Sequence, residues 1–238
     1  MNTVLPLLST IVTLIFAVTV FDQFLARRRS YQLVWAIGLA LYLMGTAAEF
    51  TVGAYGVSSG AYRVRYLCGG LLTAAWLGMG TVYLLFPGKG AHVVMGVLVV
   101  ASLAGVYQIV ASPVDVSKIQ TLPLSSEGFE KGIWGVRGLL IILTNTFGTI
   151  TLAGGAVYSA VFFWRRGIYP HRILSNVLIA VGAMMPALGG TLIRAGIPSA
   201  NYVLELVGVI VIFIGFLRNR EVFGLYRFPL VHGLRRVS

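Results

Sequence analysis

Residues 189–208 read Gly-Gly-Thr-Leu-Ile-Arg-Ala-Gly-Ile-Pro-Ser-Ala-Asn-Tyr-Val-Leu-Glu-Leu-Val-Gly. This pattern predicts a tight hairpin between two apolar helices. Arg194 falls near the end of the first helix, and Glu205 falls about two turns into the second. An ionisable side chain inside a membrane span is costly to bury, and by default it marks a functional site. The hairpin is therefore the first place to look for function.

The composition indicates a membrane protein. Of the 238 residues, 58% are hydrophobic and 11% are charged, and the mean hydropathy is +0.88. A soluble globular chain carries about 25% charged residues. This chain has too little polar surface to cover a soluble fold, so we expect a bundle in which lipid replaces water as the outer solvent.

Seven apolar runs are each close to the roughly 20 residues that a helix needs to cross a bilayer. We expect an all-α bundle of seven transmembrane helices over residues 1–220, followed by a basic, amphipathic tail over 221–238 on the inner membrane surface. No basic stretch precedes the first run, so we interpret it as a membrane helix and not as a cleaved signal peptide. The predicted spans are residues 3–25, 32–54, 64–86, 91–111, 137–163, 172–195 and 199–217.

The distribution of positive charge predicts the orientation. The chain has 18 basic and 7 acidic residues and a net charge of +11. Twelve of the Lys and Arg residues fall on one side of the predicted spans and six on the other. The positive-inside rule then places the N-terminus outside and the C-terminus inside, in a multi-pass protein of the plasma membrane. Because the positive residues lie between apolar runs, this rule explains them better than nucleic-acid binding does.

Several polar side chains are predicted to lie at a similar depth in the outer half of the bundle. Glu49 lies roughly 7 Å from the outer end of its helix, at about 1.5 Å per residue, and Glu205 and Asn145 lie at comparable depths. Arg65 and Arg194 fall near the outer boundary. Buried charges of opposite sign pair to avoid uncompensated charge. The candidate ligand-binding residues are therefore Glu49, Arg65, Asn145, Arg194 and Glu205.

This polar layer has three interpretations that the sequence leaves open. It is a set of ion pairs, Glu205 with Arg194 and Glu49 with Arg65, that fix helix packing. Alternatively it lines an outward-open pocket for a small polar or amphipathic ligand, or it belongs to a proton or ion pathway. The segment 112–136 is long for a bundle connection, so it is either mobile or a cap over the outer face. Tyr202 fits an interfacial aromatic belt.

Motifs for cofactors and catalysis are missing from the sequence. The three histidines fall in inner loops or in the tail, so no pair is placed to hold a haem across the bilayer. The seventh span contains no lysine for a retinal Schiff base, and Cys68 is the only cysteine. The chain contains no HExxH, GxSxG or P-loop motif. We therefore expect no cofactor, no metal site and no enzymatic activity.

The second predicted helix contains the run Val-Trp-Ala-Ile-Gly-Leu-Ala-Leu-Tyr-Leu-Met-Gly-Thr-Ala-Ala-Glu-Phe over residues 34–50. Its Trp near the start and Glu near the end, within seven spans that begin outside, resemble the amino-terminal seven-helix sensor region of some bacterial histidine kinases and cyclases. The resemblance implies a sensing function. The sequence departs from the pattern of these sensor regions after Arg220, where no coiled coil or catalytic domain follows. Signal output is therefore expected to need a separate partner protein.

These observations predict a non-enzymatic integral membrane protein that senses a ligand or serves as an accessory subunit of a membrane complex. The expected partners are the lipid bilayer, a small-molecule or lipid ligand, and a membrane subunit or signalling protein, with no nucleic acid. The alternative is a small-solute or ion transporter or channel. A third hypothesis is an intramembrane enzyme that handles lipids or quinones.

Overall fold

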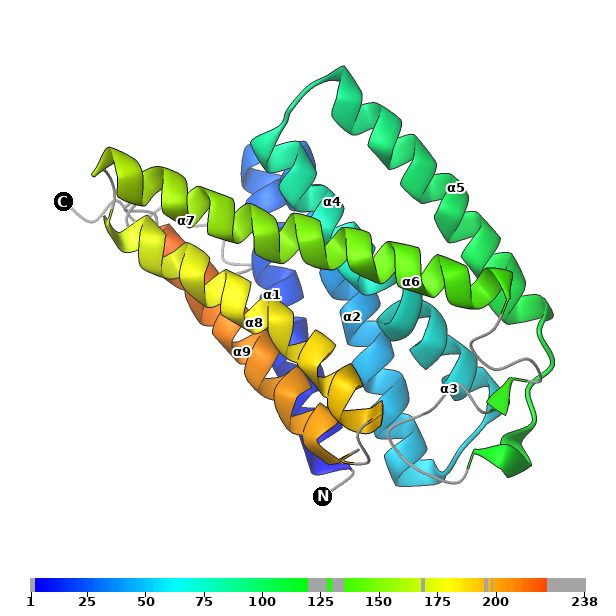
Figure 1. The fold of residues 1–238 in the computed structure, drawn as a ribbon. Coiled ribbons are helices and arrows are strands. Elements are labelled where there is room, and N and C mark those ends of the chain that lie inside the picture. Colours follow the sequence, from blue (N-terminus) through cyan, green and yellow to red (C-terminus); the bar gives the residue numbers. More distant parts are fainter. Residues whose placement is uncertain are drawn as a thin grey trace.

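The structure is a computed structural model that describes residues 3–119, 128–129, 135–167, 170–194, 197 and 199–221. These residues form a helical bundle (Figure 1), and seven helices are long and apolar enough to cross a membrane. The prediction of an all-α, seven-span bundle is thereby confirmed. The predicted tail lies outside the described residues, except for Glu221 at the end of the last helix.

The spans lie where the apolar runs predict them, with ends that differ by a few residues. The third and fifth spans are each composed of α-helix, a π-helical segment and α-helix again. The bounds are α1 Val4–Arg27, α2 Ser30–Tyr55, α3 Ser59–Val64, a π-helix Arg65–Leu72, α4 Thr73–Leu85, α5 Lys89–Ala111, α6 Val136–Thr149, a second π-helix Ile150–Gly154, α7 Gly155–Arg166, α8 Pro170–Arg194 and α9 Ser199–Glu221. A short 3-10 helix spans Val116–Lys118.

Local sequence signals explain several helix ends. The side chain of Ser58 accepts a hydrogen bond from the backbone N–H of Ala61 and so caps α3. Gly167 ends α7 in the left-handed conformation, with φ 62°, and its N–H returns to the carbonyl groups of the last turn. The α1 helix ends at Arg28, also left-handed with φ 51°. Short turns such as these join successive spans, except for the 112–136 segment between α5 and α6.

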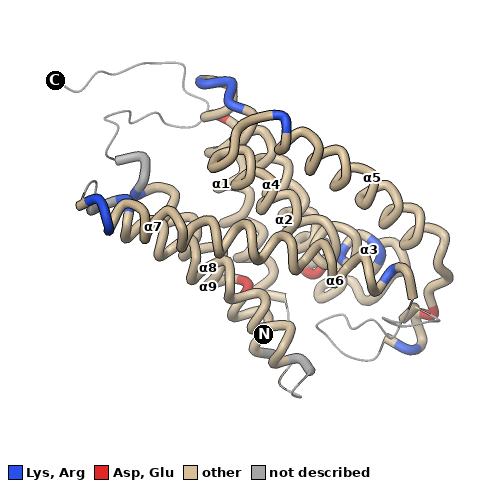
Figure 2. Tube along the Cα trace, turned by 45° about the horizontal axis from the view of Figure 1, so that its top comes forward, with Lys and Arg blue, Asp and Glu red and all other residues tan. Residues whose placement is uncertain are grey.

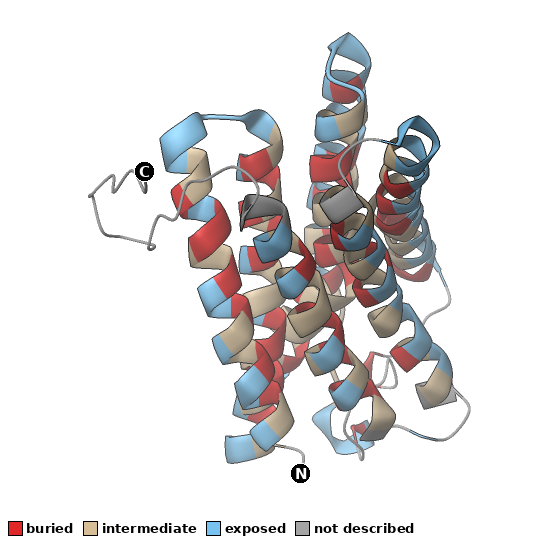
Figure 3. Cartoon of the chain, turned by 90° about the vertical axis from the view of Figure 1, so that its left-hand side faces the viewer, coloured by how far each residue is buried: buried red, intermediate tan, exposed pale blue. Residues whose placement is uncertain are grey.

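The helices pack around the third span and the α1–α2–α9 interface, and α5 lies at the edge of the bundle (Figure 1). Phe16, Leu39 and Val209 meet where α1, α2 and α9 contact one another. Figure 3 shows buried residues on the inward faces and exposed residues outside. The α5 helix exposes a row of large apolar side chains, Val93, Val97, Val100, Leu103, Tyr107 and Val110. Such a surface suits contact with lipid chains.

The two ends of the bundle differ in composition. The loop end contains the α2–α3 turn, the 112–136 segment and the α8–α9 turn. The arginine end contains the α1–α2, α4–α5 and α7–α8 turns, and Figure 2 shows Lys and Arg gathered at those turns. The basic residues of the arginine end within helices or described turns are Arg27, Arg28, Arg29, Lys89, Arg165, Arg166, Arg172, Arg218 and Arg220.

The described residues of the 112–136 segment favour a cap over the loop end. Phe129 is buried and its ring contacts those of Tyr62, tilted, and Tyr66, edge-on, with centroids 4.9 and 5.1 Å away. The guanidinium of Arg137 lies 4.0 Å from the centre of the same ring. An isolated β-bridge joins Val114 to Phe129. These contacts tie the segment to the third and fifth spans beside the predicted polar layer.

Candidate functional site: a buried charge triad

Arg65 links two buried carboxylates that come from different spans. Its Nε donates to Glu49 on α2, and its Nη2 lies 2.9 Å from Glu205 Oε1 on α9. The side chains of Glu49 and Glu205 are 1% and 9% exposed, and that of Arg65 is 17% exposed. We call Glu49, Arg65 and Glu205 the charge triad. It joins the second, third and seventh spans about six residues, or roughly 9 Å, from the loop end.

Small residues allow the helices of the triad to approach closely. A Cβ added at Gly45 would lie 3.0 Å from the backbone of Gly69, so α2 and the third span touch one turn from both Glu49 and Arg65. A Cβ at Gly69 would lie 2.3 Å from Arg65 Nη1. Glycine at position 69 therefore leaves the space that the guanidinium occupies. Residue 65 also begins the π-helix, a distortion that is frequent at functional sites.

Two further side chains support Glu205. Asn201, one turn earlier on α9, donates from Nδ2 to Glu205 Oε1 at 3.0 Å. The hydroxyl of Tyr42 on α2 donates to the backbone carbonyl of Glu205 at 3.1 Å. Asn201 is itself held where α8 and α9 meet, since a Cβ at Gly189 would lie 2.5 Å from its Oδ1. The predicted hairpin thus positions one carboxylate of the triad.

Two buried polar atoms near the triad have no hydrogen-bond partner among the described residues. They are Glu49 Oε2 and the hydroxyl of Tyr202. Tyr202 interacts electrostatically with all three members of the triad and is 2% exposed. Its assignment to an interfacial belt is therefore wrong, because α9 turns this ring into the bundle. A buried polar atom without a partner costs about 1–3 kcal/mol, which favours a group that would bind there.

The charges of the triad are also out of balance. Among the described side chains, the two carboxyl groups share a single guanidinium, and excess buried charge is costly unless it is compensated. A proton, a cationic group or a strong hydrogen-bond donor beside Glu49 would restore the balance. Within the described part of the chain, no group of three or more His, Cys, Asp or Glu residues is placed to hold a metal ion.

The triad is closed in this conformation. Glu49 and Tyr202 are both almost fully buried. A ligand therefore reaches Glu49 only if the surrounding helices move. This geometry agrees with the interpretation in which the polar layer is a set of ion pairs that fix helix packing. It differs from the interpretation in which the layer lines a pocket that is already open to the outside before a ligand binds.

The structure brings together three of the five predicted site residues. The Glu49–Arg65 pair is confirmed, and Glu205 joins it through the same arginine. Asn145 instead donates to the carbonyl oxygens of Gly70 and Ile141, at 2.6 and 2.8 Å, so it anchors the π-helix of the third span. The side chain of Arg194 lies outside the described residues, and its pairing with Glu205 stays a prediction.

Sequence reasoning missed Tyr42 and Asn201 and placed Tyr202 in the wrong role. Asn201 precedes Glu205 by four residues, and Tyr42 precedes Glu49 by seven, so each pair shares one helix face. That spacing was the signal that could have found them. Tyr202 gave no such signal, because an aromatic residue near a span end fits a membrane interface equally well.

The comparison with known proteins gives no relative: no protein-family model matches the chain, and no curated protein sequence matches it.

Proposed function

We propose that the chain is a non-enzymatic, multi-pass membrane protein of the plasma membrane that senses a small ligand, alone or as the accessory subunit of a larger complex. Its N-terminus and loop end face outside. The twofold excess of Lys and Arg on the opposite side supports this orientation through the positive-inside rule. The resemblance of the second span to bacterial sensor regions supports the same function.

The observation that supports the proposal is Glu49 Oε2, which has no hydrogen-bond partner among the described residues and belongs to a triad with one described guanidinium for two carboxyl groups. The ligand is a small molecule with a cationic or hydrogen-donating group that binds Glu49 beside Tyr202. Because the triad is closed, binding is coupled to a movement of helices. The helices would exchange between this closed arrangement and an open one, and a ligand shifts that equilibrium only by its difference in affinity for the two. A hydrogen bond to Glu49 that forms only in the open arrangement supplies that difference.

The triad is well placed to report binding to the other end of the molecule. Arg65 ties α2 and α9 together at the loop end, and both helices run to the arginine end. A group that competes with Arg65 for Glu49 would loosen this tie. Rigid helices transmit such a change as a small shift or rotation. A partner protein at the arginine end would then read the position of α2 or α9.

The proposal is tested with purified protein in detergent or nanodiscs, using a panel of small ammonium and amine compounds. The readout is the ligand-dependent shift in the unfolding temperature. We expect at least one compound to stabilise the natural chain and to lose its effect in Glu49→Gln. Asp115→Asn is the matched control, because it removes an exposed carboxylate outside the triad.

The proposal fails if Glu49→Gln and Glu205→Gln both keep the full shift. Flux of the same compound into proteoliposomes separates sensing from transport. A sensor binds the compound without net uptake, whereas uptake that depends on Glu49 would identify a transporter.

A further inference from the structure

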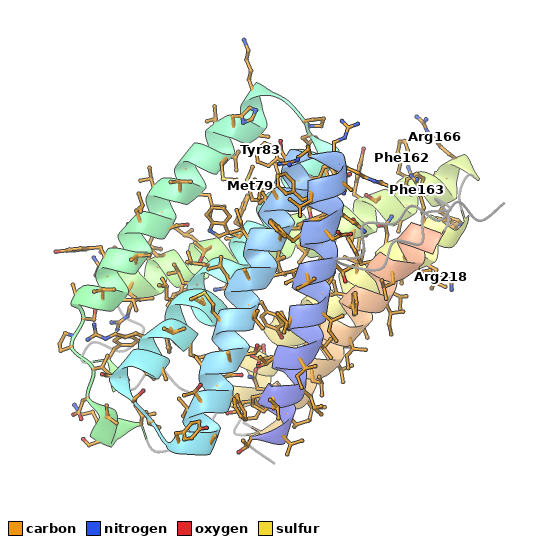
Figure 4. The ribbon with its side chains drawn as sticks, turned by 180° about the vertical axis from the view of Figure 1, so that it is seen from behind. Met79, Tyr83, Phe162, Phe163, Arg166 and Arg218 are labelled. Atoms are coloured by element: carbon orange, nitrogen blue, oxygen red, sulfur yellow. The ribbon has the colours of Figure 1, made fainter. Side chains whose placement is uncertain are left out.

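A second polar site lies at the arginine end, on the opposite side of the bundle from the triad. The turn between α1 and α2 and the turn between α4 and α5 border a cavity of about 720 Å³. Six polar or charged side chains line it together with Leu84, Pro87 and Gly88. The six are Arg27, Arg29, Ser30, Tyr31, Tyr83 and His92. Figure 4 shows Tyr83 at the α4–α5 end of its helix, one turn beyond Met79.

The described residues of this wall are basic and include no carboxylate. Arg27 and Arg29 bring two guanidinium groups, which match the geometry of a phosphate. Hydroxyl groups of Ser30 and Tyr31 add further donors. The charge of the cavity is thus opposite to that of the triad, and an anion is the ligand that it fits.

Tyr83 also orients His92 in the wall. The Tyr83 hydroxyl lies 3.0 Å from His92 Nδ1. When this hydroxyl donates to Nδ1, the ring carries its proton on Nε2, and an imidazolium carries a proton there as well. In both states Nε2 is a donor that can bind an anion. His92 is exposed, so a ligand in the cavity can reach it.

We propose that this cavity binds the phosphate of an anionic phospholipid headgroup. It lies at the end of four spans, at the level where headgroups meet a membrane protein, and basic pockets between helices at that level bind such headgroups. Val93 follows His92 directly and begins the exposed apolar row of α5, which continues with Val97 and Val100. An acyl chain can lie along that row while its phosphate lies in the cavity. This ligand does not depend on the proposed sensing function.

The neighbouring Arg28 offers a matched control. It belongs to the same run of three arginines but is absent from the cavity wall, and its guanidinium lies 5.7 Å from the ring centre of Phe24 on α1. Arg28→Gln changes the net charge by the same amount as Arg27→Gln or Arg29→Gln. A bound headgroup distinguishes these positions, whereas general attraction to an anionic surface does not.

The test measures lipid binding to the purified full chain by native mass spectrometry. Phosphatidylglycerol and phosphatidylcholine with identical acyl chains are titrated separately, so that only the headgroup differs. We expect tighter binding of phosphatidylglycerol, weakened roughly fivefold by Arg27→Gln or by Arg29→Gln, and roughly 25-fold by the double variant. Arg28→Gln should stay within about twofold of the natural chain. His92→Asn, at an exposed position, is a second variant that should weaken binding.

Three outcomes would overturn the proposal. Equal loss of binding in Arg28→Gln and Arg29→Gln would show diffuse attraction in place of a site. Equal binding of the two lipids would show that the acyl chains, and not the headgroup, determine the affinity. Inorganic phosphate, tested in phosphatidylcholine nanodiscs by the shift in unfolding temperature, is the third arm. If it stabilises the protein as much as phosphatidylglycerol does, with the same dependence on Arg27 and Arg29, the ligand is a soluble anion.

Discussion

The loop end and the arginine end use the same residue type in opposite ways. At the loop end, Arg65 is largely enclosed and holds two carboxylates from neighbouring spans. At the arginine end, Arg27 and Arg29 are exposed beside a cavity whose described lining residues include no carboxylate. Figure 2 shows these two groups of charge at opposite ends of the helices. An arginine thus joins helices where it is enclosed between carboxylates, whereas Arg27 and Arg29 at the other end lie at the exposed surface of the bundle.

The difference is one of energy as well as position. Breaking a buried ion pair leaves an uncompensated charge in the low-dielectric interior, which is strongly destabilising. An exposed arginine is solvated, and its removal changes stability little. The two ends are therefore expected to respond to equivalent substitutions with very different changes in the free energy of unfolding.

Arg65→Met is expected to have the largest effect, because it leaves Glu49 and Glu205 buried without their cation. The expected loss is about 3–5 kcal/mol in the free energy of unfolding. Chemical denaturation in detergent measures it, with Arg28→Met as the control at the arginine end. Replacing all three triad residues with apolar side chains should recover much of the stability. If Arg65→Met alone had the same free energy of unfolding as the natural chain, the triad would not hold the helices together.

Gly69→Ala should come next, because the added Cβ would lie 2.3 Å from Arg65 Nη1 and displace the guanidinium. Overpacking of this kind costs about 1–3 kcal/mol. Gly70→Ala is the control at the adjacent position, where the nearest atom is Tyr66 Cδ1 at 3.9 Å. Alanine is the better helix former by about 1 kcal/mol, so Gly70→Ala should be neutral or stabilising. Equal unfolding temperatures for the two variants would argue against a steric requirement at Gly69.

Asn145→Leu separates packing from ligand binding. It removes the hydrogen bonds to Gly70 and Ile141, and the expected cost is about 1 kcal/mol. The shift in unfolding temperature caused by a triad ligand should be unchanged, since Asn145 contacts the π-helix and not the triad. If Asn145→Leu abolished that shift in unfolding temperature, Asn145 would belong to the ligand-binding site.

Arg29→Gln is expected to have the smallest effect on folding. The side chain is exposed, so the free energy of unfolding should stay within about 0.5 kcal/mol of the natural value. The measurement is the same denaturation curve used for Arg65→Met, in a detergent without anionic lipid. A loss comparable to that of Arg65→Met would remove the contrast between the two ends.

Much of the architecture could be read from the sequence. Apolar runs of about 20 residues predict the spans, and the distance of Glu49 and Glu205 from the ends of their helices predicts that both lie at one level. The Glu49–Arg65 pair was predictable because the two spans are consecutive and joined by a short turn. The contact between Arg65 and Glu205 was not, because three other spans lie between them in the chain.

Other parts of the site depend on tertiary packing in a similar way. Whether an aromatic side chain such as Tyr202 faces lipid or the bundle depends on the rotation of its helix. The third span becomes π-helical at Arg65, and no residue pattern in the sequence predicted this change. The cavity at the arginine end forms between two turns that are 50 to 60 residues apart in the chain.

By itself, the sequence determined that this protein is an apolar helical bundle with carboxylates buried in two spans, because hydrophobicity and helix length are local properties. Only the tertiary structure decided that the hairpin of residues 189–208 meets the second and third spans, and that one arginine holds both carboxylates. The physical reason is that a buried charge is compensated by whichever opposite charge the packing brings within a few ångströms. Close approach at Gly45 and Gly69 selected Arg65 for that role.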